Sequence, residues 1–187
     1  SALVGWSLAS GSHDWLTVLH IVLFASAIFL ADLYPLRVPT RGNAEVTISC
    51  AFKTAVAIIY GPQVAVLTTL LGTAAAEAAM KRKWYKAVFN ISAMVLTSAG
   101  LIAVYYALSS APRDPFLSAQ NGIAVLALVI AYFVINVGLV SVLMSLLSGA
   151  NPFQIYRANL RSVFLNNLTI IPLGALIAHL WIYAPWT

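Results

Sequence analysis

Lys53 is the residue whose chemistry is least expected at its position. It lies within residues 46–60, a segment that is otherwise apolar apart from a few small polar side chains and a tyrosine. A charged side chain at hydrocarbon depth costs roughly 2.5–3.5 kcal/mol on insertion scales, so it usually faces a partner or a cavity. Lys53 therefore marks the first place where we expect a functional site.

Several other polar residues are predicted to lie in the same half of the membrane as Lys53. A helix rises about 1.5 Å per residue, which places Lys53 roughly 10 Å from the nearer membrane face. The acidic residue Asp32 ends the first apolar segment, at the edge of this half. We predict a ligand-binding site or polar core formed by Lys53, Glu77, Asn90, Asn136 and Asn166.

Two interpretations of this cluster remain open. The side chains either line a pocket or an ion pathway, or they hold helices together through amide hydrogen bonds worth about 0.6 kcal/mol each. Lys53 itself either extends its ammonium toward the interface or pairs with Glu77 on the next helix. Counting from the predicted turn at Gly61 and Pro62, Lys53 is closer to the turn by about 10 Å, and an extended lysine closes part of that gap.

Catalytic and metal-binding signatures are absent from the sequence. It has no His-Glu-x-x-His, no Gly-x-Ser-x-Gly and no phosphate-binding loop. The histidines His13, His20 and His179 do not share a helix at ligand spacing. We therefore predict a protein that is not an enzyme and that has no cofactor and no metal site.

The composition predicts the elements that must position the polar residues. The chain has 187 residues, of which 61% are hydrophobic and only 8% charged, against about 25% charged in an average soluble domain. We predict an all-α fold, a single integral-membrane domain over residues 1–187 with about six transmembrane helices. A span of about 30 Å needs about 20 residues, and the apolar segments are residues 15–31, 46–60, 64–80, 87–108, 119–147 and 160–183.

Basic residues in the loops predict the orientation. With the N-terminus outside, Arg113 is the one basic loop residue on the outer side. The cytoplasmic side then carries Arg37, Arg41, Lys81, Arg82, Lys83, Lys86, Arg157 and Arg161. This bias follows the positive-inside rule and argues against nucleic acid as the partner of the net positive charge. An even number of helices also places the C-terminus outside.

Three short stretches resemble a known family. Residues 32–35, 45–49 and 60–62 form the first, residues 84–90 the second, and residues 172–174 with 183–186 the third. Together they resemble the multi-helix N-terminal membrane domain that precedes HD-GYP and GGDEF domains in bacterial signalling proteins. The resemblance implies a sensor-type module in the bacterial cytoplasmic membrane. In that family one further helix leads to a cytoplasmic output domain, so we expect the chain to be a fragment or a stand-alone relative.

Two alternative functions remain open. The helix count and the Gly61–Pro62 hairpin are also similar to the substrate-binding subunits of energy-coupling-factor vitamin transporters. Such a subunit takes its ligand from the outside, whereas the predicted polar cluster lies toward the cytoplasm. The second alternative is an accessory subunit of a larger membrane complex. Its expected partners are the lipid bilayer, a small-molecule ligand, and other membrane subunits or a second copy of the chain.

Overall fold

Helices make up nearly all of the fold in a computed structural model of the protein, which describes residues 14–37, 45–46, 48–116 and 118–184. The side chains of residues 14, 16, 17, 36, 37, 45, 46 and 161–166 lie outside this description. The helices are α1 (Asp14–Leu33), α2 (Ser49–Tyr60), α3 (Pro62–Ala79), α4 (Trp84–Leu108), α5 (Ala119–Tyr132), the π-helical η1 (Phe133–Val137), α6 (Gly138–Ser148) and α7 (Pro152–Tyr183). The predicted all-α class is confirmed, with one small addition. The short strands β1 (Leu36–Arg37) and β2 (Glu45–Val46) form an antiparallel pair after α1.

The helix boundaries follow local chemistry at two places where the sequence is informative. Gly61 has a φ of +88°, which favours glycine, and Pro62 then occupies the first turn of α3. The last helix begins earlier than residue 160, the predicted start. The Asn151 side chain caps it by accepting from the Phe153 N–H at 2.9 Å, and Pro152 occupies its first turn.

Two helical stretches, Trp84–Leu108 and Ala119–Ser148, are long and apolar enough to cross a membrane. The second is continuous through α5, η1 and α6, as the predicted fifth segment required. Shorter apolar helices cover Val18–Leu33, Ser49–Tyr60 and Asn167–Tyr183. Six crossings and an outside N-terminus remain predictions.

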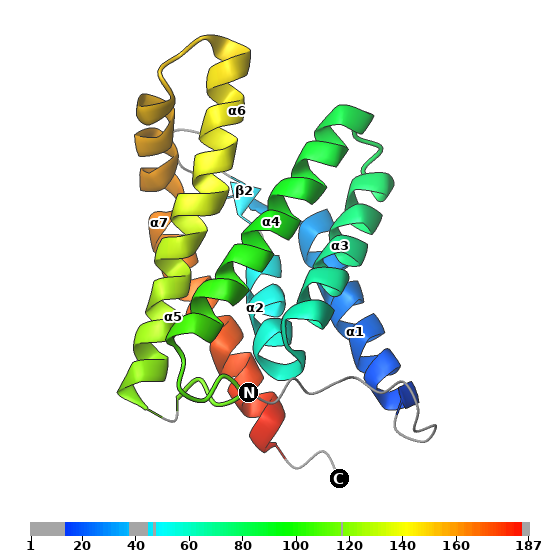
Figure 1. The fold of residues 1–187 in the computed structure, drawn as a ribbon. Helices are drawn as coiled ribbons and strands as arrows, with labels where there is room; N and C mark the ends of the chain where they lie inside the picture. The colour runs from blue at the N-terminus through cyan, green and yellow to red at the C-terminus, as the bar shows by residue number, and fades with distance from the viewer. Residues whose placement is uncertain (1–13, 38–44, 47, 117, 185–187) are drawn as a thin grey trace.

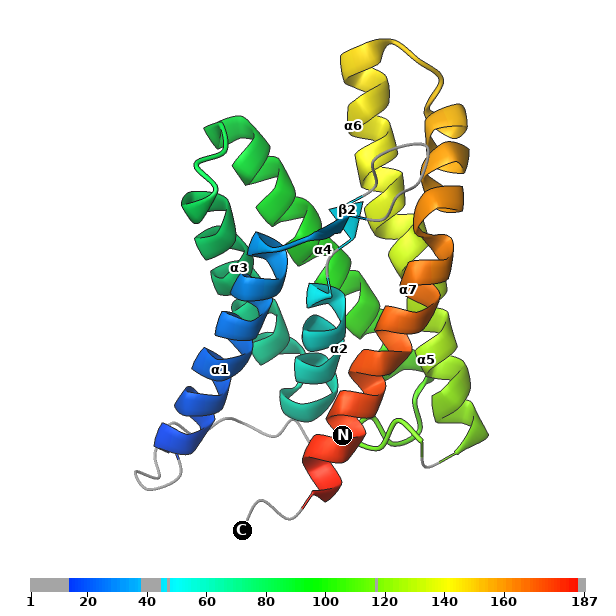
Figure 2. The ribbon, with the colours of Figure 1, turned by 180° about the vertical axis from the view of Figure 1, so that it is seen from behind.

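The short helix α2 is the centre of the bundle (Figure 1, Figure 2), and most of its side chains are buried. It packs most extensively against α7, and also contacts α1 and α3. A Cβ added at Gly174 on α7 would meet the Ala51 carbonyl and lie 2.8 Å from the Thr54 Cβ on α2. A Cβ at Gly72 on α3 would lie 2.7 Å from the Ile28 side chain on α1. These glycines let the helices approach closely and fix which residues face one another.

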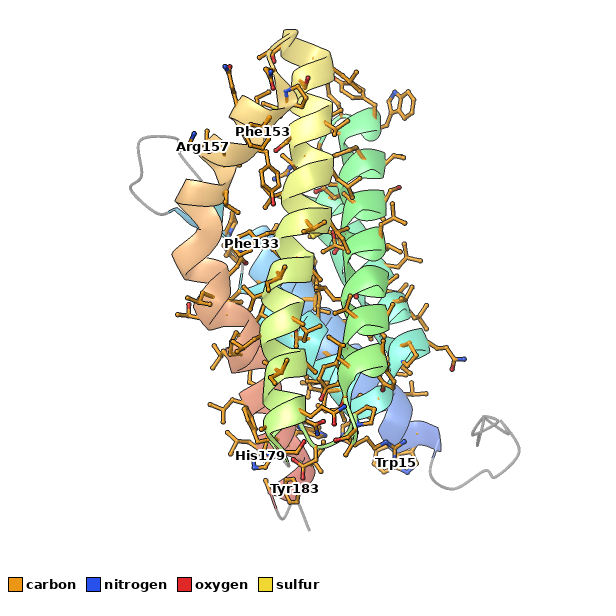
Figure 3. All side chains as sticks on the ribbon, turned by 60° about the vertical axis from the view of Figure 1, so that its left-hand side comes forward. Trp15, Phe133, Phe153, Arg157, His179 and Tyr183 are labelled. Atoms are coloured by element: carbon orange, nitrogen blue, oxygen red, sulfur yellow. The ribbon has the colours of Figure 1, made fainter. Side chains whose placement is uncertain are left out.

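The two ends of the bundle differ in chemistry. The α3–α4 and α6–α7 connections lie at one end (Figure 1), where the chain carries Lys81, Arg82 and Arg157, and we name it the basic end. The start of α1 and the end of α7 lie at the opposite end, where Trp15 and Tyr183 are found (Figure 3), and we name it the aromatic end.

Candidate functional site

Four helices bring polar side chains together in the half of the bundle nearer the basic end. Asp32 is in the last turn of α1, and Lys53 is one turn into α2. Thr73 and Glu77 are four residues apart on α3, so they lie on the same face of that helix. Asn90 is in the second turn of α4. The structure therefore places Lys53, Glu77 and Asn90 of the predicted set in the same half of the bundle.

Lys53 forms a buried ion pair with Asp32. Its Nζ lies 3.3 Å from Asp32 Oδ2 and donates to Ser49 Oγ at 3.1 Å. Thr73 Oγ1 donates to the same Asp32 oxygen at 3.0 Å. The exposed fractions of the Lys53 and Asp32 side chains are 6% and 11%. An isolated charge would be costly there, so each of the two charges stabilises the other.

The predicted pairing of Lys53 with Glu77 is wrong, because the ammonium pairs with Asp32. The ammonium does point back along α2, toward Ser49 and the last turn of α1, but it remains buried. Thr73, which shares Asp32 with Lys53, lies one helical turn before Glu77 on α3. Four residues correspond to a rise of about 6 Å, so Glu77 lies beyond the lysine and closer to the basic end.

Glu77 has its own partners and one oxygen without any. Its Oε1 accepts from Asn90 Nδ2 at 3.0 Å and from Arg82 Nη1 at 3.2 Å. Its Oε2 is buried and has no hydrogen-bond partner. The Glu77 side chain is 5% exposed, whereas that of Arg82 is 36% exposed. A buried carboxylate oxygen without a donor is unusual, because most buried polar atoms are hydrogen-bonded.

Asp32 and Glu77 both line a cavity of about 180 Å³. This basic-end cavity is lined by Asp32, Pro35, Thr73, Glu77, Met80, Arg82, Asn90 and Met94. Since a water molecule occupies about 30 Å³ of liquid, the volume corresponds to about six waters or a small organic molecule. Glu77, which has one oxygen without a hydrogen-bond partner, thus lines a space large enough to hold a ligand.

A second, much smaller cavity lies on the other side of Lys53. It measures about 20 Å³ and is bordered by Lys53, Thr54 and Ser98 together with apolar side chains of α2, α4 and α5. That volume holds about one water. Thr54 Oγ1 is buried without a partner beside it, so an internal water is the simplest occupant. We assign no ligand to this space.

The other predicted site residues are peripheral. Asn136 is buried in η1, and its Nδ2 lies 3.6 Å from Met94 Sδ. It therefore supports a cavity-lining methionine rather than the cavity itself. The backbone of Asn166 is in α7, but its side chain lies outside the described part of the structure. Of the predicted set, Glu77 and Asn90 contact each other directly, whereas Lys53 belongs to a separate group with Asp32 and Thr73.

Three important residues were missed as members of the site: Asp32, Thr73 and Arg82. The sequence placed Asp32 at the right depth, and a carboxylate at the end of one helix is a natural partner for a lysine at similar depth on the next. Thr73 is harder to find, because a threonine in a small-residue stretch usually indicates close helix packing. Arg82 was counted only as a loop charge.

A different polar cluster joins α7 to the α4–α5 connection at the aromatic end. Asp114 accepts from the Tyr183 hydroxyl at 2.5 Å and from the Phe116 N–H at 3.3 Å, and His179 Nδ1 lies 3.6 Å away. The Tyr183 hydrogen bond is the main cause that lowers the pKa of Asp114 below its usual value. Figure 3 shows His179 and Tyr183 together on α7. This cluster holds the end of α7 in place.

Asn121 organises the same α4–α5 connection. Its side chain is fully buried, and its Oδ1 accepts from the Ser110 N–H at 3.0 Å and from two nearby hydroxyls. Its Nδ2 donates to the Ala111 carbonyl at 3.1 Å and to the Asp114 carbonyl at 2.5 Å. One amide thus satisfies several backbone groups, which is a structural role.

Within the described residues there is no group of three or more His, Cys, Asp or Glu side chains that could hold a metal ion. His20 packs against Trp181 with ring centroids 5.1 Å apart, and also against Tyr60, as an aromatic core residue would. His13 lies outside the described residues.

Comparisons with protein-family models, with curated proteins and with solved structures find no match to this chain. The resemblance to the membrane domains of bacterial signalling proteins is therefore still a prediction. The function must be argued from the geometry of the basic-end cavity and from the surface of the helices.

Proposed function

We propose that the chain is a multi-pass protein of the bacterial cytoplasmic membrane and acts as a sensor or regulatory module that binds a small molecule in the basic-end cavity. Lipid contact is supported by the outer face of α5 and η1. Ile123, Leu126, Ile130 and Val134 recur there every three or four residues and are 55–66% exposed. An apolar stripe of this kind fits a lipid or protein contact better than water.

The observation that carries the ligand-binding part is that Glu77, a residue lining the cavity, has a buried oxygen without a hydrogen-bond partner. If the polar residues served only to hold helices together, every buried polar atom would be expected to find a protein partner. Ionisable residues within membrane segments mark functional sites by default. Glu77 and Asp32 on either side of a ligand-sized space therefore favour a pocket over interhelical contacts alone.

Regulation would follow from the elements that border the cavity. Asp32 is at the end of α1, Glu77 is at the end of α3, and Asn90 is near the start of α4. A molecule held between them would stabilise the arrangement in which these helix ends lie close together. A ligand shifts such an equilibrium by its difference in affinity for the two arrangements. In a six-crossing topology with an outside N-terminus, this change would take place on the cytoplasmic side.

The alternative of a transporter subunit makes a different demand. Its ligand must enter from outside, which in the proposed topology is the aromatic end. The described cavity that Glu77 lines is instead nearer the basic end. An accessory subunit without a ligand would need no such cavity. Both alternatives are outcomes of the experiments below.

Two measurements test the proposal. Native mass spectrometry after gentle extraction should detect a small molecule bound to the wild-type protein and lost from the Glu77→Gln variant. An unliganded wild-type protein would instead favour a purely structural cluster. For the orientation, the single cysteine Cys50 is buried, so introduced cysteines can be labelled selectively. In intact cells, a membrane-impermeant maleimide should label Arg113→Cys and leave Lys81→Cys unlabelled; the reverse pattern contradicts the topology.

A further inference from the structure

The two carboxylates on the wall of the basic-end cavity offer unused hydrogen-bond acceptors. The hydroxyl of Thr73 already donates to Asp32, and one N–H of the Asn90 amide donates to Glu77. The two carboxylates each use a single oxygen in these bonds, namely Asp32 Oδ2 and Glu77 Oε1. An ionised carboxylate accepts only and has about four lone-pair sites. The missing partner is therefore a donor.

Among the described residues, the basic side chains of Lys53 and Arg82 are directed elsewhere or weakly held. Lys53 donates to Asp32 and Ser49 and is not part of the cavity wall. Arg82 is on the wall, but it is 36% exposed and contacts Glu77 through one nitrogen at 3.2 Å. A guanidinium can form two parallel bonds with a carboxylate, and this one leaves Glu77 Oε2 unpartnered. Arg82 is thus a cation at the rim that a better-placed cation can replace.

The other described residues of the wall are apolar. They are Met80, Met94 and Pro35. Methionine side chains are flexible and polarizable and adapt to alkyl groups. A volume of about 180 Å³ accommodates a short alkyl chain with one polar head group.

We propose that the basic-end cavity binds a small organic cation of the primary-ammonium class. The ammonium donates to Glu77 Oε2 and to the Asp32 carboxylate, and the alkyl part packs against the two methionines. The bound cation competes with Arg82 for Glu77. This assignment rests on the proposed ligand-binding role of the cavity and adds the charge and the donor chemistry of the ligand.

Other ligand classes fit the wall less well. An anion would be repelled by two carboxylates at short range in a region of low dielectric. A neutral amide supplies N–H groups but no charge to take the place of that of Arg82 beside Glu77. An inorganic cation prefers a shell of several oxygens and would leave the apolar part of the cavity unfilled.

The experiment compares three solutes of similar size that differ in charge. Propylammonium, propionamide and propionate are titrated into the full chain in detergent micelles at pH 7, with sodium chloride balancing the ionic strength. Binding is measured by isothermal titration calorimetry and by the midpoint of thermal unfolding. Propylammonium is expected to bind and to raise the midpoint, while the other two solutes and sodium alone do not.

One variant is expected to weaken propylammonium binding and another to strengthen it, so a general loss of folding cannot explain both results. Glu77→Gln should weaken propylammonium binding by about tenfold or more, because a charge-assisted hydrogen bond is lost. Arg82→Gln, at a half-exposed position, should strengthen it several-fold by removing the competing cation. The control Arg113→Gln, an exposed arginine in the α4–α5 connection, should leave it unchanged.

The outcomes separate this inference from the proposed function. Binding of propionate or propionamide in preference to propylammonium, or a weaker propylammonium affinity in Arg82→Gln, overturns the cation assignment and leaves a ligand-binding cavity. Binding of sodium alone with equal stabilisation also overturns it. If none of the solutes binds and the wild-type protein carries no co-purified molecule, both proposals are wrong.

Discussion

Replacing Lys53 by methionine tests the ion pair that organises the site. Methionine keeps much of the length and apolar stem of lysine and removes the ammonium. Asp32 would then keep only the hydrogen bond from Thr73, at 3.0 Å, with its side chain 11% exposed. Breaking a buried pair by removing one partner typically costs 3–5 kcal/mol. Asp32 borders a cavity that water can fill, so we expect the lower end of this range, about 3 kcal/mol.

The assay is the free energy of unfolding, obtained by titrating a denaturing detergent into micelles of a mild one. Asp32→Asn in the Lys53→Met background removes the second charge, and the double variant should be more stable than Lys53→Met alone. The control is Lys86→Met, at an exposed position on α4, which should change stability by less than about 0.5 kcal/mol. A cost for Lys53→Met no larger than that of the control, or further loss of stability in the double variant, refutes the pairing.

Three further predictions concern other parts of the fold. Gly174→Ala should destabilise the protein by about 1–3 kcal/mol, because the added Cβ meets the backbone of α2; Gly122→Ala, where no atom lies within 4 Å of the added Cβ, should be neutral or stabilising in the same unfolding titration. Asp114 has a lowered pKa in the folded protein, so its contribution is complete above the usual value of 3.8 and is lost as the pH falls through the lowered value. Thermal midpoints measured from about pH 6 to about pH 3 should therefore fall less steeply in Asp114→Asn; an unchanged acid dependence would count against the hydrogen bond from α7. Asn121→Ala should cost about 2–3 kcal/mol because several backbone groups lose their partner, whereas Gln120→Ala should cost less than about 1 kcal/mol; equal losses would rule out the organising role.

Hydropathy predicted the helices well, for a physical reason. In hydrocarbon the backbone must satisfy its own hydrogen bonds, so a long apolar segment is expected to be helical. The continuous helix through α5, η1 and α6 agrees with the predicted residues 119–147 to within about one residue. The start of α7 was missed because residues 152–159 are too polar to stand out as a membrane segment, and the π-helical turn in η1 has no signal in hydropathy.

The sequence predicted the depth of the site's side chains in the bundle but not the neighbouring helix toward which each one points. A position along an apolar segment gives the depth of a side chain, and this placed Glu77 and Asn90 in the same half, where they do meet. It does not say toward which neighbour a side chain points. The close approach of α1 and α3 at Gly72 sets that direction and brings Asp32 to Thr73. The partner of Lys53 is therefore Asp32, which counting residues from the Gly61–Pro62 turn could not identify.

The most direct test of the ligand-binding cavity is an experimental density map of the protein after gentle extraction from its membrane. We predict non-protein density, larger than a single water, between Asp32 and Glu77 and within hydrogen-bond distance of Glu77 Oε2. A collapsed space in which Glu77 Oε2 accepts from a side chain of the protein would contradict the account.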